Sequence, residues 1–458
     1  MKLKSLLAMP LVCLAVACGN APKGADNPVL TIEGGLVQGV LTDSTNVMVY
    51  KGIPYAAPPT GELRWKKPQP VVAWDGVKIA DKWGPAAMQA KHQEGQFYTT
   101  EFYWEGDPEM SEDCLYLNVW APAATVGNTE AKLPVAMWIH GGAYSGGYGY
   151  EVTMDGDDWA QHGVILVTIN YRLGVLGFLS HPLLSAEDAD HTSGNYGTYD
   201  QAAALKWIHN NIAQFGGDPN NITVFGQSAG AQSVKTMVTS PETKGLVAKA
   251  IIQSIGGIGE AISSASAEDA EKLGKDIMDA GGLTTLEQMR AASYDELSAA
   301  ISKYMMEKKT YVMLAPHIDG KLLPTDFSTA AMKNEISDVP YMIGHTANDI
   351  FPLGDSERRL CEVRDSIGSY KAYNYSFNRA LPGDSAGAFH SSELWFMFHT
   401  LKNSWRPFTA GDYKLSDKMI DYWTNFAKTG NPNANGSNEW PASTKDAPFV
   451  MQLQVEEE

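Results

Sequence analysis

Two serines of this chain are flanked by glycines in the pattern G-x-S-x-G, which is typical of a serine nucleophile on a sharp turn between a strand and a helix. Ser228 lies in the first copy, residues 226–230, and Ser385 lies in the second, residues 383–387. Such a serine attacks a carbonyl carbon when a histidine takes its proton and an acid holds that histidine. The segments around each serine decide which of them has the surroundings that this chemistry needs.

The flanking segments favour Ser228. The apolar run 222–225 before it is typical of a buried strand, and residues 231–237 after it can form a helix. Ser385 instead follows polar residues and Pro382, which are unsuited to a central strand. We therefore predict that Ser228 is the nucleophile and that Ser385 is a loop residue.

Chain order narrows the search for the base and the acid. In enzymes with this turn the order is Ser, then Asp or Glu, then His. Among the histidines after Ser228, His390 directly follows a glycine-containing loop, whereas His399 follows an aromatic segment on which it can pack. Asp349 lies on the loop after a strand-like run, residues 339–344. We predict a catalytic triad of Ser228, Asp349 and His390, in which Asp349 fixes the tautomer of the histidine.

A glycine-rich loop supplies a candidate for the stabilisation of negative charge on the substrate oxygen. Residues 140–144, His-Gly-Gly-Ala-Tyr, follow a strand-like run that ends at Ile139. Because glycine has no β-carbon, the backbone N–H groups of such a loop can approach a substrate closely. Ala229, the residue after the nucleophile, would supply one more N–H. A simple turn between a strand and a helix is the alternative interpretation.

The elements that must position these residues alternate along the chain. Residues 134–139, 164–169 and 221–225 are apolar or β-branched runs between turn signals, and residues 199–215 have apolar side chains at helical spacing. This alternation predicts an α/β fold with a mostly parallel central sheet and helices on both faces. Residues 260–305 contain no strand-like run, so we expect helices outside the sheet.

Composition excludes several classes of function. The chain has 458 residues and a formal net charge of −18, with 53 acidic and 35 basic residues. Nucleic acid is therefore not expected as a partner, since phosphate binding needs clustered Lys and Arg. A hydrophobic content of 44% also excludes a disordered chain. The four cysteines form no CxxC pair that would indicate a structural zinc site.

The first residues have the features of an export signal. Residues 1–17 contain two lysines, an apolar run and small residues directly before Cys18, a pattern that resembles a bacterial lipobox. We expect cleavage before Cys18, a lipid on this cysteine that anchors the chain to a membrane of the cell envelope, and a flexible tether over residues 18–28. An ordinary cleaved signal with a chance cysteine is the alternative. Cys114 and Cys361 then either pair or remain two buried thiols.

Several longer motifs give the chain a family resemblance. From about residue 29 to about residue 450 it resembles the type-B carboxylesterases, which include the cholinesterases and the non-catalytic neuroligins. The resemblance rests on YKGIPYAAPP (50–59), LRW (63–65), SEDCLYLNV (111–119), NYRLG (170–174) and FGGDP (215–219). It implies an α/β-hydrolase domain over residues 29–458 and the same triad. It also implies oxyanion donors at Gly142, Ala143 and Ala229.

The chain departs from the family pattern at four places. Asp349 followed by Ile350 replaces the usual Glu-Gly, and Ala143 replaces the third glycine of the oxyanion loop. Gln227 replaces the common Glu before the nucleophile, which makes a cationic substrate less attractive. Residues 87–88 contain no cysteine at the place where family members usually pair one with the equivalent of Cys114.

The predicted activity is hydrolysis of small or aromatic carboxylic esters through an acyl-enzyme, a reaction that requires no metal or organic cofactor. An amidase or thioesterase with the same triad, and a neuroligin-like binding module, are the alternatives. The aromatic side chains of residues 97–104 either form the rim of the substrate site or pack a long loop.

Overall fold

The computed structural model describes residues 27–42, 45–259, 264–434 and 436–456. The predicted signal, Cys18 and most of the predicted tether therefore lie outside the described residues.

Two small sheets are formed by segments in the N-terminal quarter of the chain. They consist of β1 (Val29–Ile32), β2 (Gly35–Gln38) and β5 (Val77–Ile79), and of β6 (Ala86–Ala87) and β7 (Met110–Ser111).

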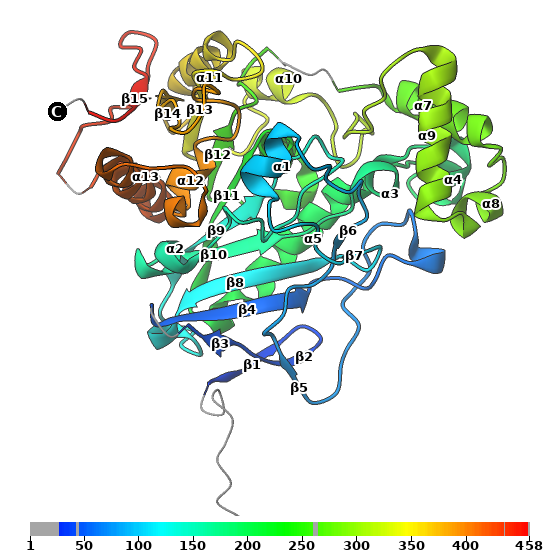
Figure 1. Ribbon diagram of the computed structural model, residues 1–458, viewed down its shortest axis with the longest axis horizontal. Helices are drawn as coiled ribbons and strands as arrows, with labels where there is room; N and C mark the ends of the chain where they lie inside the picture. The colour runs from blue at the N-terminus through cyan, green and yellow to red at the C-terminus, as the bar shows by residue number, and fades with distance from the viewer. Residues whose placement is uncertain (1–26, 43–44, 260–263, 435, 457–458) are drawn as a thin grey trace, which may run out of the picture.

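A ten-stranded sheet forms the centre of the described part of the chain (Figure 1). In spatial order its strands are β15 (Met451–Leu453), β14 (Ala372–Phe377), β13 (Tyr341–Thr346), β12 (Lys249–Gln253), β11 (Gly217–Gln227), β9 (Leu133–Ile139), β10 (Ile165–Ile169), β8 (Tyr116–Pro122), β4 (Val47–Pro54) and β3 (Val40–Leu41). The strands from β15 to β10 run parallel, whereas β8, β4 and β3 pair antiparallel at one side. The predicted mostly parallel sheet is confirmed.

Successive side chains of β9 point to opposite faces of the sheet, and each face has its own buried cluster. Val135, Met137 and Ile139 point into one buried cluster, while Ala136 and Trp138 point into another. Because successive side chains of a strand face opposite sides, a strand covered on both faces must be apolar throughout. This requirement explains why the buried strands read as continuous apolar runs in the sequence.

Helices cover both faces of this sheet. The cluster with Met137 contains side chains of α5 (Tyr196–Asn211), α6 (Ala229–Thr239), α10 (Phe327–Met332) and α11 (Gly354–Ile367). The cluster with Trp138 contains side chains of α2 (Asp157–Gln161), α12 (Leu394–Met397) and α13 (Ala410–Thr429). Short 3-10 helices are η1 (Gly61–Leu63), η2 (Ala123–Thr125), η3 (Ile212–Phe215), η4 (Pro241–Thr243) and η5 (Leu401–Asn403).

A separate helical unit stands at one end of the sheet, at the right of Figure 1. It contains α7 (Ala267–Gly281), α8 (Leu286–Ala291) and α9 (Tyr294–Lys308), which pack through Ile277, Met278 and Leu297. The same cluster includes side chains of α3 (Gly174–Phe178) and α4 (Pro182–Glu187). The expectation of helices outside the sheet is confirmed for the described residues of this stretch.

One further expectation concerns the two cysteines of the folded part. Cys114 and Cys361 are both buried free thiols, so the pairing alternative is not realised.

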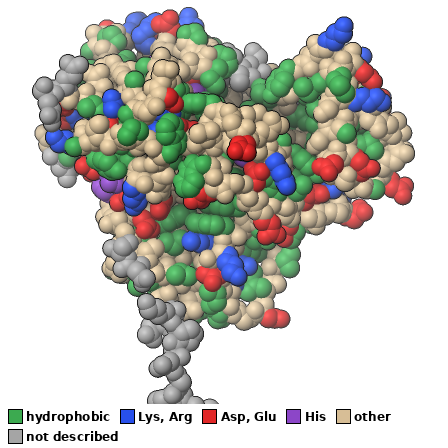
Figure 2. All heavy atoms as spheres, viewed as in Figure 1, with side chains coloured by type: hydrophobic (Ala, Val, Ile, Leu, Met, Phe, Trp, Pro, Cys, Tyr) green, Lys and Arg blue, Asp and Glu red, His purple; other side chains and the backbone are tan. Residues whose placement is uncertain are grey.

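On the face shown in Figure 2, Lys and Arg side chains lie among Asp and Glu side chains. Within the described ranges, no helix is long and apolar enough to cross a bilayer.

Candidate active site

Ser228 lies on a strained turn between β11 and α6. Its backbone has φ 58° and ψ −125°, a conformation that L-residues rarely adopt. The backbone N–H of Ser228 donates to the carbonyl oxygen of Gln253, 2.8 Å away. A β-carbon at Gly230 would lie 2.0 Å from the carbonyl oxygen of Ile139, so only glycine fits there. The predicted nucleophile elbow is therefore present, with the strand before it and the helix after it.

His390 and Asp349 are in direct contact. Nδ1 of His390 lies 2.7 Å from Oδ1 of Asp349, and the side chains are 10% and 2% exposed. Burial of Asp349 opposes ionisation, but the hydrogen bond and charge of His390 outweigh it and lower the pKa of this carboxyl group. An ionised Asp349 therefore accepts the Nδ1–H of His390, which leaves Nε2 as the unprotonated nitrogen of the ring.

The loop that carries Asp349 follows β13 and holds the carboxylate with further donors. The backbone N–H and the hydroxyl of Thr346 donate to Oδ2 over 3.3 and 3.2 Å, and the N–H of Ile350 donates to Oδ1 over 2.7 Å. Asn348 fastens this loop to the histidine loop, since its N–H donates to the carbonyl of Ala388 and its side-chain oxygen accepts from the N–H of Ala388. The acid and the base are thus held on two loops that bond to each other.

Gln227 contacts the reactive nitrogen of the base. Its side-chain amide donates to Nε2 of His390 over 3.2 Å, a contact that the sequence did not predict. Within the described residues, no hydrogen bond joins the Ser228 hydroxyl to His390, although both side chains line the same cavity. Catalytic hydrogen bonds are often formed only when substrate is bound. The Gln227 amide therefore contacts the imidazole nitrogen that a serine hydroxyl must reach to give up its proton.

The oxyanion loop packs directly on the nucleophile. A β-carbon at Gly141 would lie 2.8 Å from the carbonyl oxygen of Gln227 and 3.2 Å from Cβ of Ser228. Gly142 and Ala143 have φ of 98° and 52°. Among the backbone hydrogen bonds of the described loops and turns, none has the N–H of Gly142 or Ala143 as its donor. Ala229 is the first residue of α6, where N–H groups lack partners within the helix. The role of these three N–H groups as oxyanion donors stays a prediction.

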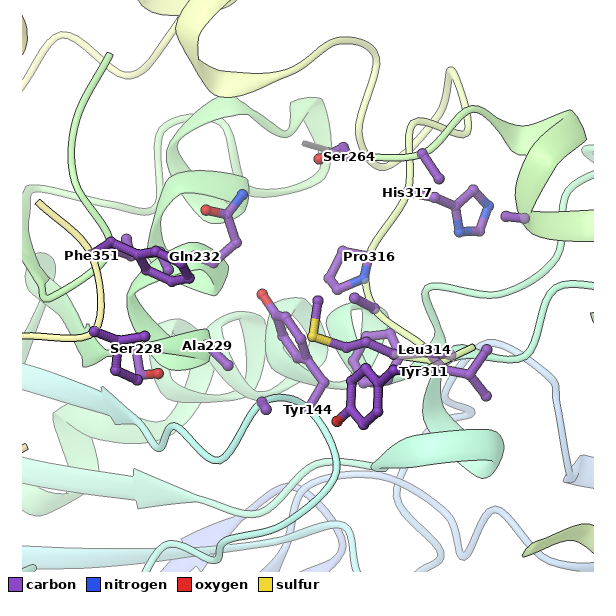
Figure 3. A pocket seen from close by; sticks show the side chains of 18 of the residues that line it. Tyr144, Ser228, Ala229, Gln232, Ser264, Tyr311, Leu314, Pro316, His317 and Phe351 are labelled. Carbon is purple, nitrogen blue, oxygen red and sulfur yellow. The ribbon is translucent and has the colours of Figure 1, made fainter. Parts of the chain in front are cut away.

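A cavity of about 600 Å³ opens above the nucleophile. Figure 3 shows Ser228 and Ala229 at one end and Leu314 and His317 toward the other. Its described lining contains one carboxylate, Asp269, and no Lys or Arg. The remaining wall is largely aromatic and aliphatic and includes Tyr144, Phe178, Leu273, Tyr311, Leu314 and Phe351.

The aromatic residues 97–104 do not belong to this described lining. Phe97 to Phe102 instead form the helix α1 (Phe97–Phe102). The ring of Phe97 packs edge-on against Phe389, and that of Phe102 stacks on Trp395. Phe102 is thus buried in the core, whereas Phe97, Tyr98 and Trp104 are exposed, and a contribution of these exposed rings to the rim of the substrate site stays a prediction.

Two buried ionisable groups lie near the site, of which the sequence pattern indicated His140 only as part of the glycine-rich loop and did not indicate Glu393. Glu393 is completely buried three residues after His390, and burial, together with the charge of Asp349, raises its pKa to about 7. His140 is completely buried in the oxyanion loop, where burial lowers its pKa to about 4. His140 is thus neutral beside the oxyanion donors. Only the position of Glu393 close to the base in the chain could have drawn attention to it.

The remaining candidates lie outside this arrangement. Ser385 is in a loop, as predicted, and it is absent from the described lining of the cavity. His399 bonds to Asp417 and Asp158, which separates it from the triad.

Comparisons with known proteins show which family the chain belongs to. The model of the carboxylesterase family matches residues 26–357 and 360–458. The chain belongs to the carboxylesterase family. This membership confirms the predicted α/β-hydrolase fold and carboxylic-ester hydrolase activity, and it does not favour the alternative of a binding module.

Individual relatives cover different shares of the chain. Over 71% of the chain, it is 39% identical to fumonisin B1 esterase of Sphingopyxis macrogoltabida, and this alignment spans 57% of that relative. It is 35% identical to para-nitrobenzyl esterase of Bacillus subtilis, with 93% of this chain and 95% of the relative covered. Among solved structures, a thermophilic PNB esterase superposes with a TM-score of 0.82 at 30% identity, covering 94% of this chain and 96% of the other.

Proposed function

We propose that this carboxylesterase hydrolyses uncharged esters of small or aromatic acids and alcohols through an acyl-enzyme on Ser228. The observation that carries the proposal is the Asp349–His390 pair beside Ser228, at one end of a largely apolar cavity without Lys or Arg in its described lining. An apolar wall favours apolar groups on either side of the ester bond. The name of the para-nitrobenzyl esterase, which acts on an aromatic ester, is consistent with this choice.

The first half-reaction acylates the serine. The Ser228 hydroxyl displaces the Gln227 amide at Nε2 of His390, loses its proton to Nε2, and its oxygen forms a bond with the ester carbonyl carbon. The resulting oxyanion accepts hydrogen bonds from the N–H groups of Gly142, Ala143 and Ala229. The carbon–oxygen bond to the alcohol then breaks, and the alcohol leaves with the proton from Nε2.

The second half-reaction releases the acid. A water molecule gives its proton to Nε2 of His390 and attacks the acyl carbon, which forms a second oxyanion in the same position. When this intermediate collapses, the bond to Ser228 breaks and the serine oxygen takes the proton back. Ionised Asp349 stabilises the imidazolium that forms in each half.

Hydrolysis of p-nitrophenyl butyrate by the purified domain tests the proposal. We expect turnover by the unmodified chain, loss of turnover in Ser228→Ala, and unchanged turnover in the control Ser385→Ala. A panel with butyrate, benzoate and succinate monoesters tests the substrate class, and the anionic succinate should react most slowly. Turnover by Ser228→Ala equal to that of the unmodified chain would show that another residue is the nucleophile.

We further propose that residues 1–17 are an export signal and that Cys18 carries a lipid which anchors the enzyme to a membrane of the cell envelope. The support is the sequence pattern alone. Metabolic labelling with an alkyne fatty acid and fractionation of the producing bacterium test this proposal. A Cys18→Ser variant should lose both the label and the membrane association, and a variant that stays with the membrane would contradict it.

A further inference from the structure

Arg406 connects two segments that flank His390. Its side chain is fully buried, and its Nε lies 3.0 and 2.9 Å from the two carboxylate oxygens of Glu101. On its other side Nη1 donates to the carbonyl of Pro382 over 2.9 Å and to Asp384 over 3.0 Å, while Nη2 donates to Asp384 over 2.8 Å. One guanidinium group therefore bonds to two carboxylates and one backbone carbonyl. We call this group, with Glu101, Pro382 and Asp384, the Arg406 clamp.

The first arm of the clamp leads to the backbone of His390. Glu101 is on α1, and it also accepts a hydrogen bond from Nε1 of Trp395 over 2.8 Å. Tyr98, on the same helix, donates its hydroxyl to the carbonyl oxygen of His390 over 3.2 Å. Burial and nearby carboxylates raise the pKa of Tyr98 to about 12, so this hydroxyl remains a donor at neutral pH. The clamp thus fixes the helix that bonds to the catalytic histidine.

The second arm holds the loop that ends at His390. Pro382 and Asp384 lie at the start of this loop, and the N–H of Leu381 donates to the carbonyl of Gly387, which closes it. The guanidinium also lies 5.2 Å from the ring centre of Phe389, the residue directly before the histidine. The second G-x-S-x-G copy, residues 383–387, therefore supplies Asp384 to the clamp.

We infer that Arg406 is a positioning residue that holds α1 and the histidine loop together and thereby sets the orientation of His390. The inference rests on the proposed function, because it assigns Arg406 a role through the proposed base. A planar guanidinium can bond to two carboxylates at fixed angles, whereas the ammonium of Lys cannot. A displacement of a catalytic group by about 1 Å can cost on the order of 10²-fold in rate.

Steady-state kinetics of Arg406→Lys on p-nitrophenyl butyrate test this role. We expect kcat to fall by about 10-fold or more while KM changes less than about threefold, because the cavity wall is untouched. The acid limb of the pH profile of kcat should also move, since the surroundings of His390 change. Asp384→Asn breaks only the loop arm and leaves the pair with Glu101, so it should give a smaller loss in the same direction. If Arg406→Lys does not fold, Asp384→Asn decides the matter.

Arg364→Lys is the matched control. The Arg364 guanidinium is equally buried and also pairs with an aspartate, but its partners Asp338 and Asn334 lie outside the site. This variant should keep kcat and the pH profile. The inference is overturned if Arg406→Lys or Asp384→Asn keeps both kcat and the acid limb, or if the kcat loss is matched in Arg364→Lys. An inactive unmodified chain would instead refute the proposed function.

Discussion

The side-chain amide of Gln227 donates a hydrogen bond to Nε2 of His390 over 3.2 Å, so the residue before the proposed nucleophile contacts the nitrogen that we propose takes the serine proton. An amide at this place is uncharged and can be displaced by the Ser228 hydroxyl when substrate binds. A carboxylate in the same position would attract a proton to the imidazole and a cation to the cavity. We therefore expect the identity of residue 227 to affect the base and, through its charge, the substrate that the site accepts.

The variant Gln227→Glu tests this relationship. We expect the acid limb of kcat/KM for a neutral ester to move to higher pH, because a carboxylate beside the imidazole favours its protonated form. We also expect the preference for butyrylcholine over its uncharged isostere 3,3-dimethylbutyl butyrate to rise by about tenfold, since a new charge close to the substrate attracts a cation. Both are measured from kcat/KM between pH 5 and 9. An unchanged profile and unchanged preference would mean that residue 227 does not face the reacting groups.

Asp349→Asn tests the tautomer of the base. An amide at this position cannot stabilise the imidazolium and can favour the wrong tautomer of His390, so kcat should fall by about two to four orders of magnitude. KM should change little, because Asp349 is not part of the described cavity lining. Asp355→Asn, at an exposed acid on α11, is the control and should be fully active. Full activity in Asp349→Asn would assign the acid to another residue.

Gly142→Ala tests the oxyanion loop. The new β-carbon would lie 2.1 Å from the carbonyl oxygen of Gly146, so the loop must shift and its N–H groups must move with it. Loss of one oxyanion donor lowers kcat by about 10²–10³-fold in other hydrolases, and we expect a loss of this size. The control Gly127→Ala has the same backbone strain at φ 81° with no atom within 4 Å, and it should keep kcat. Equal kcat in both variants would remove Gly142 from the mechanism.

Glu393 predicts a pH dependence of stability. Its pKa is about 7 in the folded chain and close to 4.5 in an unfolded one, so the folded state keeps a proton that the unfolded state releases between these values. Stability from this group is therefore complete below pH 4.5 and is lost as the pH rises to 7, by roughly 3 kcal/mol at most. A glutamine at position 393 does not ionise, so Glu393→Gln removes this dependence of stability on pH.

Thermal denaturation of Glu393→Gln at several pH values measures this loss. The difference in Tm between the variant and the unmodified chain should shift in favour of the variant from pH 5 to pH 8. Glu287→Gln, at an exposed acid on α8, controls for the loss of a charge. A difference in Tm that is the same at both pH values would mean that Glu393 is already ionised at pH 5.

The sequence predicted those parts of the site that depend on local patterns. The strand before Ser228, the glycines around it and the helix after it are all encoded within about a dozen neighbouring residues. Asp349 and His390 are predicted as acid and base because the loops that carry them follow a strand-like run and a glycine, respectively. These features need no knowledge of distant contacts.

Contacts between residues that are far apart in the chain are not marked by any local sequence pattern. Gln227 and His390 are 163 residues apart in the chain, and Glu101 and Arg406 are 305 apart. Only the folded sheet brings them together, so neither the bond at Nε2 nor the Arg406 clamp could be inferred from spacing. The aromatic residues of α1 look alike in the sequence, although in the structure Phe102 is buried whereas Phe97 and Tyr98 are exposed.

The nucleophile itself is tested most directly by covalent labelling. A fluorophosphonate ester loses fluoride to an activated serine and leaves a stable phosphonyl group on its oxygen, which intact-mass and peptide mass spectrometry can locate. The triad predicts one phosphonyl group per chain on the peptide that contains Ser228, full loss of ester hydrolysis with it, and much slower labelling in Asp349→Asn. A label on Ser385, or hydrolysis that survives complete labelling of Ser228, would contradict the mechanism.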